Sequence, residues 1–124
     1  MQIQARKGRK PAMNDFYDNI QKAAYFIWEY TNCDKALDMW RCAEDTAAFL
    51  GQCGMVSASD IAKFAKEDRS SFEYISFVRH IAYRIYIYTG REDDFANWID
   101  AEKLIGDDEF VNAISIAAKS YKII

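Results

Sequence analysis

One segment of the chain occurs twice. Residues 24–44 read AYFIWEYTNCDKALDMWRCAE, and residues 82–102 read AYRIYIYTGREDDFANWIDAE. The two segments align without a gap at an offset of 58 residues, and eight of the 21 aligned pairs are identical. Chance would give about one or two identities at ordinary residue frequencies. The repeat therefore restricts the fold to two copies of one structural unit, which we interpret as an internal duplication.

Each copy has the pattern of a helical hairpin. Apolar residues recur at steps of three and four on both sides of a short turn, which is the period of an α-helix. At that turn Asn32 of the first copy is aligned with Gly90 of the second. Asn and Gly are the residues that tolerate the left-handed conformation in which many helices end. We therefore predict a helix, a tight stop and a second helix packed antiparallel to the first.

The same period continues through the rest of the chain, and it predicts an all-α fold of six helices. We expect a basic N-terminal arm at residues 1–12 and one helical domain at residues 13–124, with related halves 13–68 and 69–124. The expected caps are Asn14, Asp34, Ser57 or Ser59, Ser70 with Glu73 in a capping box, and Asp94. The fourth helix is apolar on most sides and is expected at the buried centre. A strand over residues 83–88 is the less favoured alternative.

Two identical pairs of the repeat have expected roles. Trp40 and Trp98 should be buried, each covering the join to its own Ala-Tyr helix. Glu44 and Glu102 border the core face of the returning helix. We expect each carboxylate to accept a hydrogen bond within its hairpin, because a catalytic group is rarely needed twice in a small fold.

Searching for reactive groups gives no catalytic, cofactor-binding or metal-binding residue. His80 is the only histidine, and no cysteine or second histidine stands near it at ligand spacing. No glycine-rich phosphate loop is present, and the serines lie at helix starts, where capping explains them. We therefore expect a protein that is not an enzyme.

The expected compartment is the cytoplasm. Cys33, Cys42 and Cys53 are odd in number and lack metal-type spacing, which favours reduced thiols. The first ten residues are basic and polar, so we expect no signal peptide. No apolar run approaches the roughly 18 residues that span a bilayer, so we expect no membrane partner.

Charge is distributed unevenly. Residues 1–12 carry a net charge of +4, and the remainder carries −7. An acidic body repels phosphate and argues against a broad nucleic-acid surface. The arm itself has the composition of a phosphate-binding segment, and we expect it to lie against acidic surface. Met13 is an alternative start of the domain, which would make the arm an upstream extension.

The repeated segments resemble a small bacterial family of unknown function, defined by a short helical unit with the pattern A-Y-x-[IL]-W, G-R and W-x-x-A-E. Residues 82–102 match best, through Ala82, Tyr83, Ile85, Gly90, Arg91, Trp98, Ala101 and Glu102, with Tyr86 in the place of the first Trp. Residues 24–44 match more weakly, through Ala24, Tyr25, Ile27, Trp28, Trp40, Ala43 and Glu44, with Asn32 and Cys33 in place of Gly-Arg. The resemblance implies a helical hairpin and no activity.

Two function classes remain. Aromatic residues make up 15% of the chain, and tyrosine is favoured in contact surfaces, although a tyrosine-rich core with solvated hydroxyls would give the same content. The first class is a small non-enzymatic protein-binding protein, such as an inhibitor, antagonist, immunity or adaptor factor of a bacterium, phage or mobile element. Its acidic, tyrosine-rich surface would comprise Tyr74, Tyr86, Tyr88, Glu92, Asp93 and Asp94. The alternative is a nucleic-acid-binding accessory protein that uses Arg6, Lys7, Arg9 and Lys10.

Overall fold

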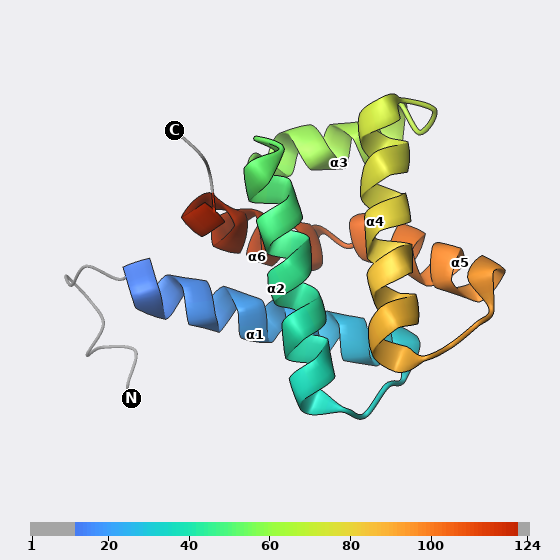
Figure 1. Ribbon diagram of the computed structural model, residues 1–124. Coiled ribbons are helices and arrows are strands. Elements are labelled where there is room, and N and C mark those ends of the chain that lie inside the picture. Colours follow the sequence, from blue (N-terminus) through green and yellow to red (C-terminus); the bar gives the residue numbers. More distant parts are fainter. Residues whose placement is uncertain (1–11, 122–124) are drawn as a thin grey trace.

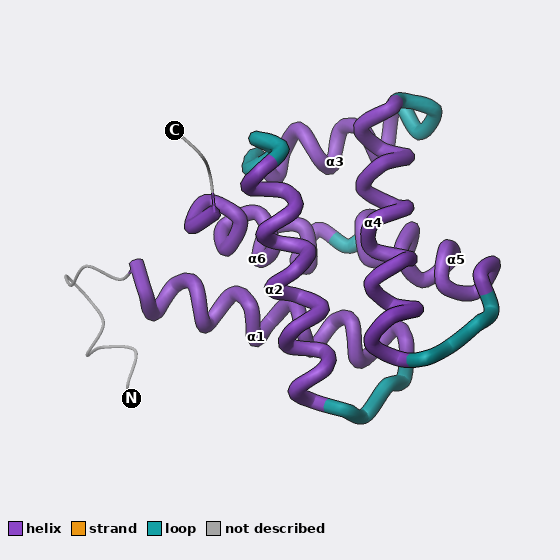
Figure 2. The backbone as a smooth tube through the Cα atoms, in the orientation of Figure 1, coloured by secondary structure: helices purple, strands orange, loops and turns teal. Residues whose placement is uncertain are grey.

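The computed structural model describes residues 12–121, with side chains from residue 16 onward, and this part of the chain consists of helices joined by short loops (Figures 1 and 2). The elements are α1 (Ala12–Thr31), α2 (Ala36–Gln52), α3 (Ala58–Glu67), α4 (Phe72–Thr89), α5 (Asp94–Ile105), α6 (Asp108–Ala118) and a closing 3₁₀ turn, η2 (Lys119–Tyr121). The predicted all-α fold of six helices is confirmed. Residues 83–88, the alternative strand, lie within α4.

Two helical hairpins and two shorter helices make up the fold. α1 packs against α2, and α4 packs against α5. α3 crosses between the ends of α2 and α4, while α6 lies behind α2 and contacts α1, α2, α3 and α5 (Figure 1). Most of the basic arm, including Arg6, Lys7, Arg9 and Lys10, lies outside the described residues, as does any contact that it makes.

Both hairpins turn through the same backbone geometry. Asn32 has φ 60° and Gly90 has φ 74°, so both occupy the left-handed region, as predicted from their alignment. Just before them, the hydroxyls of Thr31 and Thr89 donate to the carbonyl oxygen four residues earlier, at 2.7 and 2.6 Å. Each hydroxyl then accepts from the backbone N–H two residues later, at 3.3 and 3.0 Å. These bonds satisfy polar groups at the helix end and fix where it stops.

The expected helix caps are correct at one position only. Ser57 caps α3 by accepting from the backbone N–H of Asp60. α1 already includes the expected cap Asn14, since it begins at Ala12, and the cap position of α2 is Lys35 instead of Asp34.

At α4 and α5 the prediction of the cap was wrong by one residue. Ser71 caps α4 through the N–H of Tyr74 at 3.1 Å, because the hydroxyl of Ser70 donates to Asp68 in the preceding turn. Asp93 caps α5 through the N–H of Ala96 at 3.0 Å. In each case two adjacent residues have capping side chains, and the path of the incoming loop selects between them.

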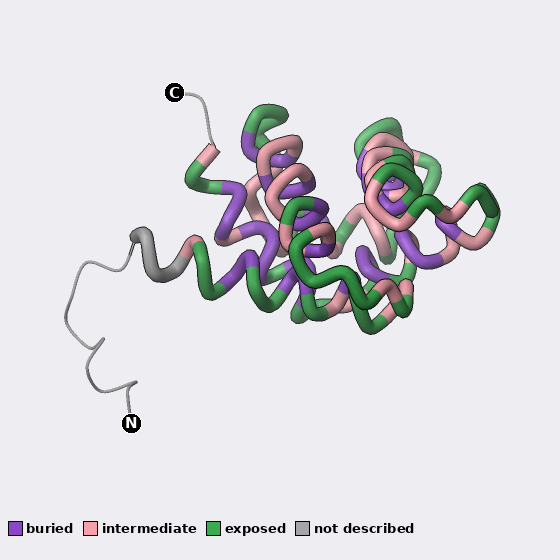
Figure 3. Tube along the Cα trace, turned by 60° about the horizontal axis from the view of Figure 1, so that its bottom comes forward, coloured by how far each residue is buried: buried purple, intermediate pink, exposed green. Residues whose placement is uncertain are grey.

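α6, and not α4, has the largest buried share of its residues, so the expected centre was wrong (burial is coloured along the chain in Figure 3). Its buried residues are Phe110, Val111, Ala113, Ile114, Ser115, Ala117 and Ala118. Small side chains on this helix let its neighbours approach closely. α4 instead exposes large apolar side chains, namely Phe72, Tyr83, Tyr86 and Ile87. Its charged residues and tyrosine hydroxyls need water, which keeps one face of this helix at the surface.

The final turn crosses α2 at Gly51. A Cβ atom at this position would lie 2.6 Å from the Cβ of Tyr121 and closer still to the carbonyl oxygen of Ala118. Only glycine allows the chain to pass here without a shift of the backbone. Gly51 thus allows the close packing of the final turn against α2.

Trp40 and Trp98 do not occupy the buried positions expected of them. Both side chains are half-buried and pack against the edge of the core. The ring of Trp40 stacks on that of Tyr17, with 5.9 Å between centroids. The small Ala43 and Ala101 fill the tight join between the paired helices, so each tryptophan is displaced outward.

Glu44 and Glu102 differ in their contacts. Glu102 accepts from the hydroxyl of Tyr74 at 3.1 Å and pairs with Arg69 at 3.0 Å, which confirms the expected bond within the second hairpin. No described side chain donates to Glu44, so the expectation for the first hairpin was wrong. The reason lies 58 residues before Tyr74, where the chain has Phe16, which lacks a hydroxyl.

Candidate protein-binding surface

Four of the six expected contact residues lie at the surface of the second hairpin. Tyr86 is exposed on the outer face of α4, Glu92 and Asp93 are exposed in the turn that leads into α5, and Asp94 is exposed at the start of α5. Asp93 also caps α5. The structure therefore brings an aromatic ring and an acidic turn together on one hairpin.

The other two expected residues serve the fold. Tyr74 is 4% exposed, and its hydroxyl is bound to Glu102, so we remove it from the contact surface. Tyr88 is half-buried and donates a short hydrogen bond to Asp45 of α2. This hydrogen bond, together with burial, raises the pKa of Tyr88 to about 12. The phenol thus ties the second hairpin to the first.

The prediction from the sequence missed an exposed aromatic residue on α4. Tyr83 was not among the expected contact residues, yet more than half of its side chain is exposed. With Tyr86 and the half-buried Trp98 it forms a pocket of about 210 Å³ between α4 and α5. The remaining lining residues are Arg79, Ala82, Asp94 and Asn97. The missed signal was the helical period of α4, which already places Tyr83 and Tyr86 side by side and away from the buried Ile81 and Ile85.

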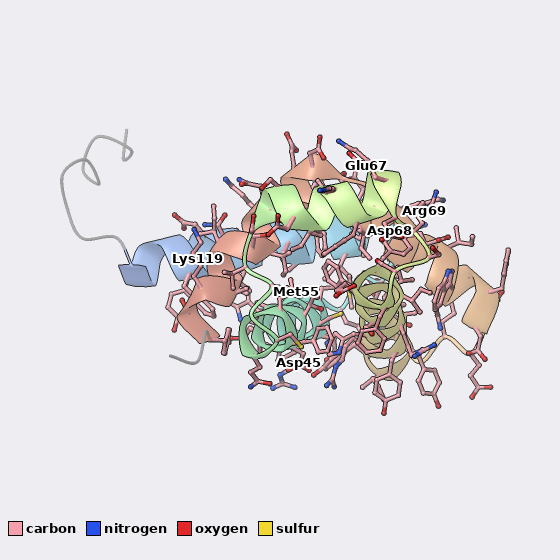
Figure 4. All side chains as sticks on the ribbon, turned by 90° about the horizontal axis from the view of Figure 1, so that it is seen from above. Asp45, Met55, Glu67, Asp68, Arg69 and Lys119 are labelled. Carbon is pink, nitrogen blue, oxygen red and sulfur yellow. The ribbon has the colours of Figure 1, made fainter. Side chains whose placement is uncertain are left out.

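A larger groove of about 920 Å³ lies among α2, α3 and α4. Its apolar lining consists of Phe49, Met55, Ile61, Phe64, Phe72 and Tyr83 (Figure 4, in which Met55 is labelled). Asp60, Glu73, Arg79 and His80 add polar groups. The groove exists because α3 buries only one residue, Ile61, and packs loosely against α4. Phe72 stands at its edge with 79% of its side chain exposed.

His80 is held as a neutral ring beside this groove. It stacks on Phe49 with 4.1 Å between ring centroids. Burial, together with the charge of Arg84, lowers the pKa of His80 to about 4 against the opposing effect of Asp45. Its Nε2 atom is buried and has no hydrogen-bond partner among the described residues. A buried, weakly basic imidazole of this kind packs as an aromatic ring and is poorly suited to general-base work at neutral pH.

Two further findings limit the chemistry that the described residues offer. Within that part of the chain, no three His, Cys, Asp or Glu side chains gather as a metal ion would require. None of its helices combines the length and the apolar character needed to cross a membrane. What the surface does offer is aromatic area beside negative charge.

Comparison with known proteins adds no assignment. No protein-family model, curated protein or solved structure matches the chain.

Proposed function

We propose that this protein is a non-enzymatic binding protein that holds a basic surface of another protein. The contact surface is the outer side of the second hairpin, where Tyr83, Tyr86 and Asp94 line one pocket and Glu92 and Asp93 are exposed in the adjoining turn. An inhibitor, antagonist, immunity or adaptor factor of a bacterium, phage or mobile element works through a surface of this type. The three cysteines are unpaired, which supports a reducing compartment such as the cytoplasm.

The observation that carries the proposal is the exposure of aromatic side chains next to acid. Tyrosine offers a partner a large contact area and loses little rotamer freedom on binding. Contiguous aromatic patches at a protein surface mark interaction sites, whereas isolated ones do not. The −7 charge of residues 13–124 favours a partner of opposite charge and accelerates its approach. Together these features select a basic protein surface as the partner.

We further propose that the two hairpins arose by internal duplication, and that each is a unit of the bacterial helical family that they resemble. The shared geometry of the Thr31–Asn32 and Thr89–Gly90 turns supports this origin. So does the order of elements, since a hairpin followed by one shorter helix occurs twice along the chain. Superposition of residues 24–44 on 82–102 as the same helix–turn–helix is the test of this part.

The proposal is tested with charge reversal at matched positions. Glu92→Lys changes the acidic turn, and Glu67→Lys makes the same charge change at the far end of α3 (Glu67 is labelled in Figure 4). Both glutamates are exposed, so both variants should fold. The wild type and the two variants are each used to recover proteins from a bacterial lysate, and the recovered proteins are quantified. Each recovered protein is then purified and titrated by calorimetry against the wild type, Glu92→Lys and Glu67→Lys. A specific partner binds the wild type and the Glu67 variant and loses affinity for the Glu92 variant.

The nucleic-acid alternative gives a different result in the same experiment. About four phosphate contacts from Arg6, Lys7, Arg9 and Lys10 would make DNA or RNA binding fall steeply with salt. Deletion of residues 2–12 would then abolish binding, while Glu92→Lys would leave it intact or strengthen it. That pattern would replace the protein-binding proposal with the nucleic-acid one.

A further inference from the structure

The two hairpins carry the same pocket. A cavity of about 430 Å³ lies between α1 and α2, lined by Gln21, Ala24, Tyr25, Trp28, Asp34, Ala36, Met39 and Trp40. All seven residues that line the pocket between α4 and α5 lie 58 positions after a residue of this set. We call these cavities the first and the second pocket. The offset that defines the sequence repeat therefore also relates the two pockets.

Solvent exposure is equal in the two places. Tyr25 is 52% exposed and Tyr83 is 54% exposed, and each ring lines its pocket. Trp28 and Tyr86, which follow one helical turn later, are 42% and 40% exposed. Trp40 and Trp98 line the pockets from the second helix of each hairpin, and each is half-buried. Each pocket thus presents three aromatic side chains on two helices.

Packing does not account for the identity of these residues. Ile27 and Ile85 are fully buried, which explains why both copies have the same side chain there. Tyr25 and Tyr83 leave half of their surface in water, and an exposed helix position accepts many residue types at little cost in stability. Identical tyrosines at matching exposed positions are explained if both pockets contact the same kind of group.

The lining residues point to a cation. Aromatic faces attract ammonium and guanidinium groups, and apolar walls cover the methylene stem of a lysine or arginine. Each pocket also contains one exposed carboxylate, from Asp34 in the first and Asp94 in the second. The protein already uses this contact internally, since the guanidinium of Arg84 lies 5.7 Å from the ring centre of Tyr83.

We propose that the first and second pockets are equivalent sites for lysine or arginine side chains of one basic partner segment. This inference rests on the proposed function and identifies what the partner presents. The two sites differ in strength. The second pocket contains Arg79 where the first has Gln21, and Arg84 occupies one side of Tyr83 where the first hairpin has Phe26. The first pocket therefore binds a cation more tightly.

Fluorescence can report on each pocket separately. The three tryptophans of the chain, Trp28, Trp40 and Trp98, all line these pockets. In a Trp98→Phe protein the emission reports on the first pocket, and in a Trp28→Phe/Trp40→Phe protein it reports on the second. The probe is an acetylated, amidated Gly-Arg-Gly-Gly-Arg-Gly peptide, compared with a peptide in which glutamine replaces both arginines.

The decisive variants are Tyr25→Ala and Tyr83→Ala, with Phe95→Ala as the control. Phe95 is also exposed but lines neither pocket. Loss of one cation–aromatic contact should weaken binding of the arginine peptide roughly two- to thirtyfold. We expect each tyrosine variant to affect its own pocket only, and Phe95→Ala to change neither. The wild-type first pocket should bind more tightly than the second, and the glutamine peptide should bind neither.

Three outcomes would overturn the inference. They are equal binding of the glutamine peptide, full affinity of both tyrosine variants, and tighter binding at the second pocket than at the first. These results are separate from those that decide the proposed function. If a protein partner loses affinity for the Glu92→Lys variant but neither pocket binds the arginine peptide, the proposed function holds and the pocket assignment is wrong. If both pockets bind the arginine peptide but no protein partner is recovered, the pocket assignment holds and the proposed function is wrong.

Discussion

The second hairpin contains a buried polar cluster whose replacement provides a quantitative test of the fold. Nη2 of Arg91 lies 2.7 Å from Oδ2 of Asp100, and Nε of Arg91 donates to Asn97 at 2.6 Å. The amide of Asn97 donates back to the carbonyl oxygen of Arg91 at 2.9 Å. Asn97 and Asp100 are buried, so these bonds replace water for both of their side chains.

The first hairpin has sulfur at the same three positions. Cys33, Met39 and Cys42 stand 58 residues before Arg91, Asn97 and Asp100, and Met39 and Cys42 are fully buried. Burial raises the pKa of Cys42 to about 12, so its thiol stays neutral. The second hairpin therefore joins its turn to its returning helix through an ion pair, and the first hairpin has apolar side chains at the same positions.

We compare Asp100→Ala with the triple variant Arg91→Cys/Asn97→Met/Asp100→Cys. Breaking a buried ion pair by removing one partner costs about 3–5 kcal/mol, whereas replacing all its members with packed apolar groups is often neutral or stabilising. The Arg91 side chain is 30% exposed, so water relieves part of the cost. We expect about 2–3 kcal/mol of destabilisation for the single variant and about zero for the triple one.

Urea unfolding followed by circular dichroism, in reducing buffer, measures both values. Asp94→Ala serves as a control for the loss of an exposed carboxylate on the same helix and should change stability by less than about 0.5 kcal/mol. If the triple variant is as unstable as Asp100→Ala, the two hairpins do not share one packing geometry at these three positions. The reasoning from the first hairpin to the second would then be wrong.

Three other changes test individual contacts. Gly51→Ala should destabilise the protein by about 1–3 kcal/mol through overpacking. Gly106→Ala, whose added Cβ meets nothing closer than 3.4 Å, should be neutral or slightly stabilising. Thermal unfolding of both variants measures the difference, and equal stability of the two would contradict it. The unfolded chain binds a proton at His80 near pH 6.5 and the folded one only near pH 4, so stability should fall as the pH drops through this window. His80→Phe should flatten that dependence, and an unchanged slope between pH 7 and pH 5 would contradict the assignment. Tyr88→Phe should destabilise the protein by about 1–2 kcal/mol, because Asp45 loses a hydrogen-bond donor. It should also remove the tyrosine that ionises at the highest pH from an ultraviolet titration. An unchanged high-pH ionisation step in the variant would refute the assignment.

Features fixed by neighbouring residues could be predicted from the sequence. The helices follow from local periodicity, and the stops at Asn32 and Gly90 follow from backbone preference, so both predictions hold. The residue that caps α4 could not be predicted, because Ser70 and Ser71 have the same side chain and only the loop that enters α4 distinguishes them. Local chemistry thus predicts that a helix begins, and tertiary structure determines at which residue.

Burial of aromatic side chains could not be predicted in the same way. Tyr74 was expected at the contact surface and is buried, while Tyr83 was not expected there and is exposed. Both belong to one helix that is apolar around most of its circumference. Which side is covered depends on where α2 and α5 pack, and the sequence of α4 alone does not determine that.

The enclosed position of α6 also bears on how the protein is made. Translation produces this helix after every α-helix that it packs against, because it is the last of the six along the chain. Until Phe110 and Ile114 emerge from the ribosome, the apolar sides of α1 and α2 have no complete cover. The nascent chain must then carry exposed hydrophobic surface, the kind of species that chaperones bind. Cooperative closure of the core is therefore expected only when synthesis has passed α6.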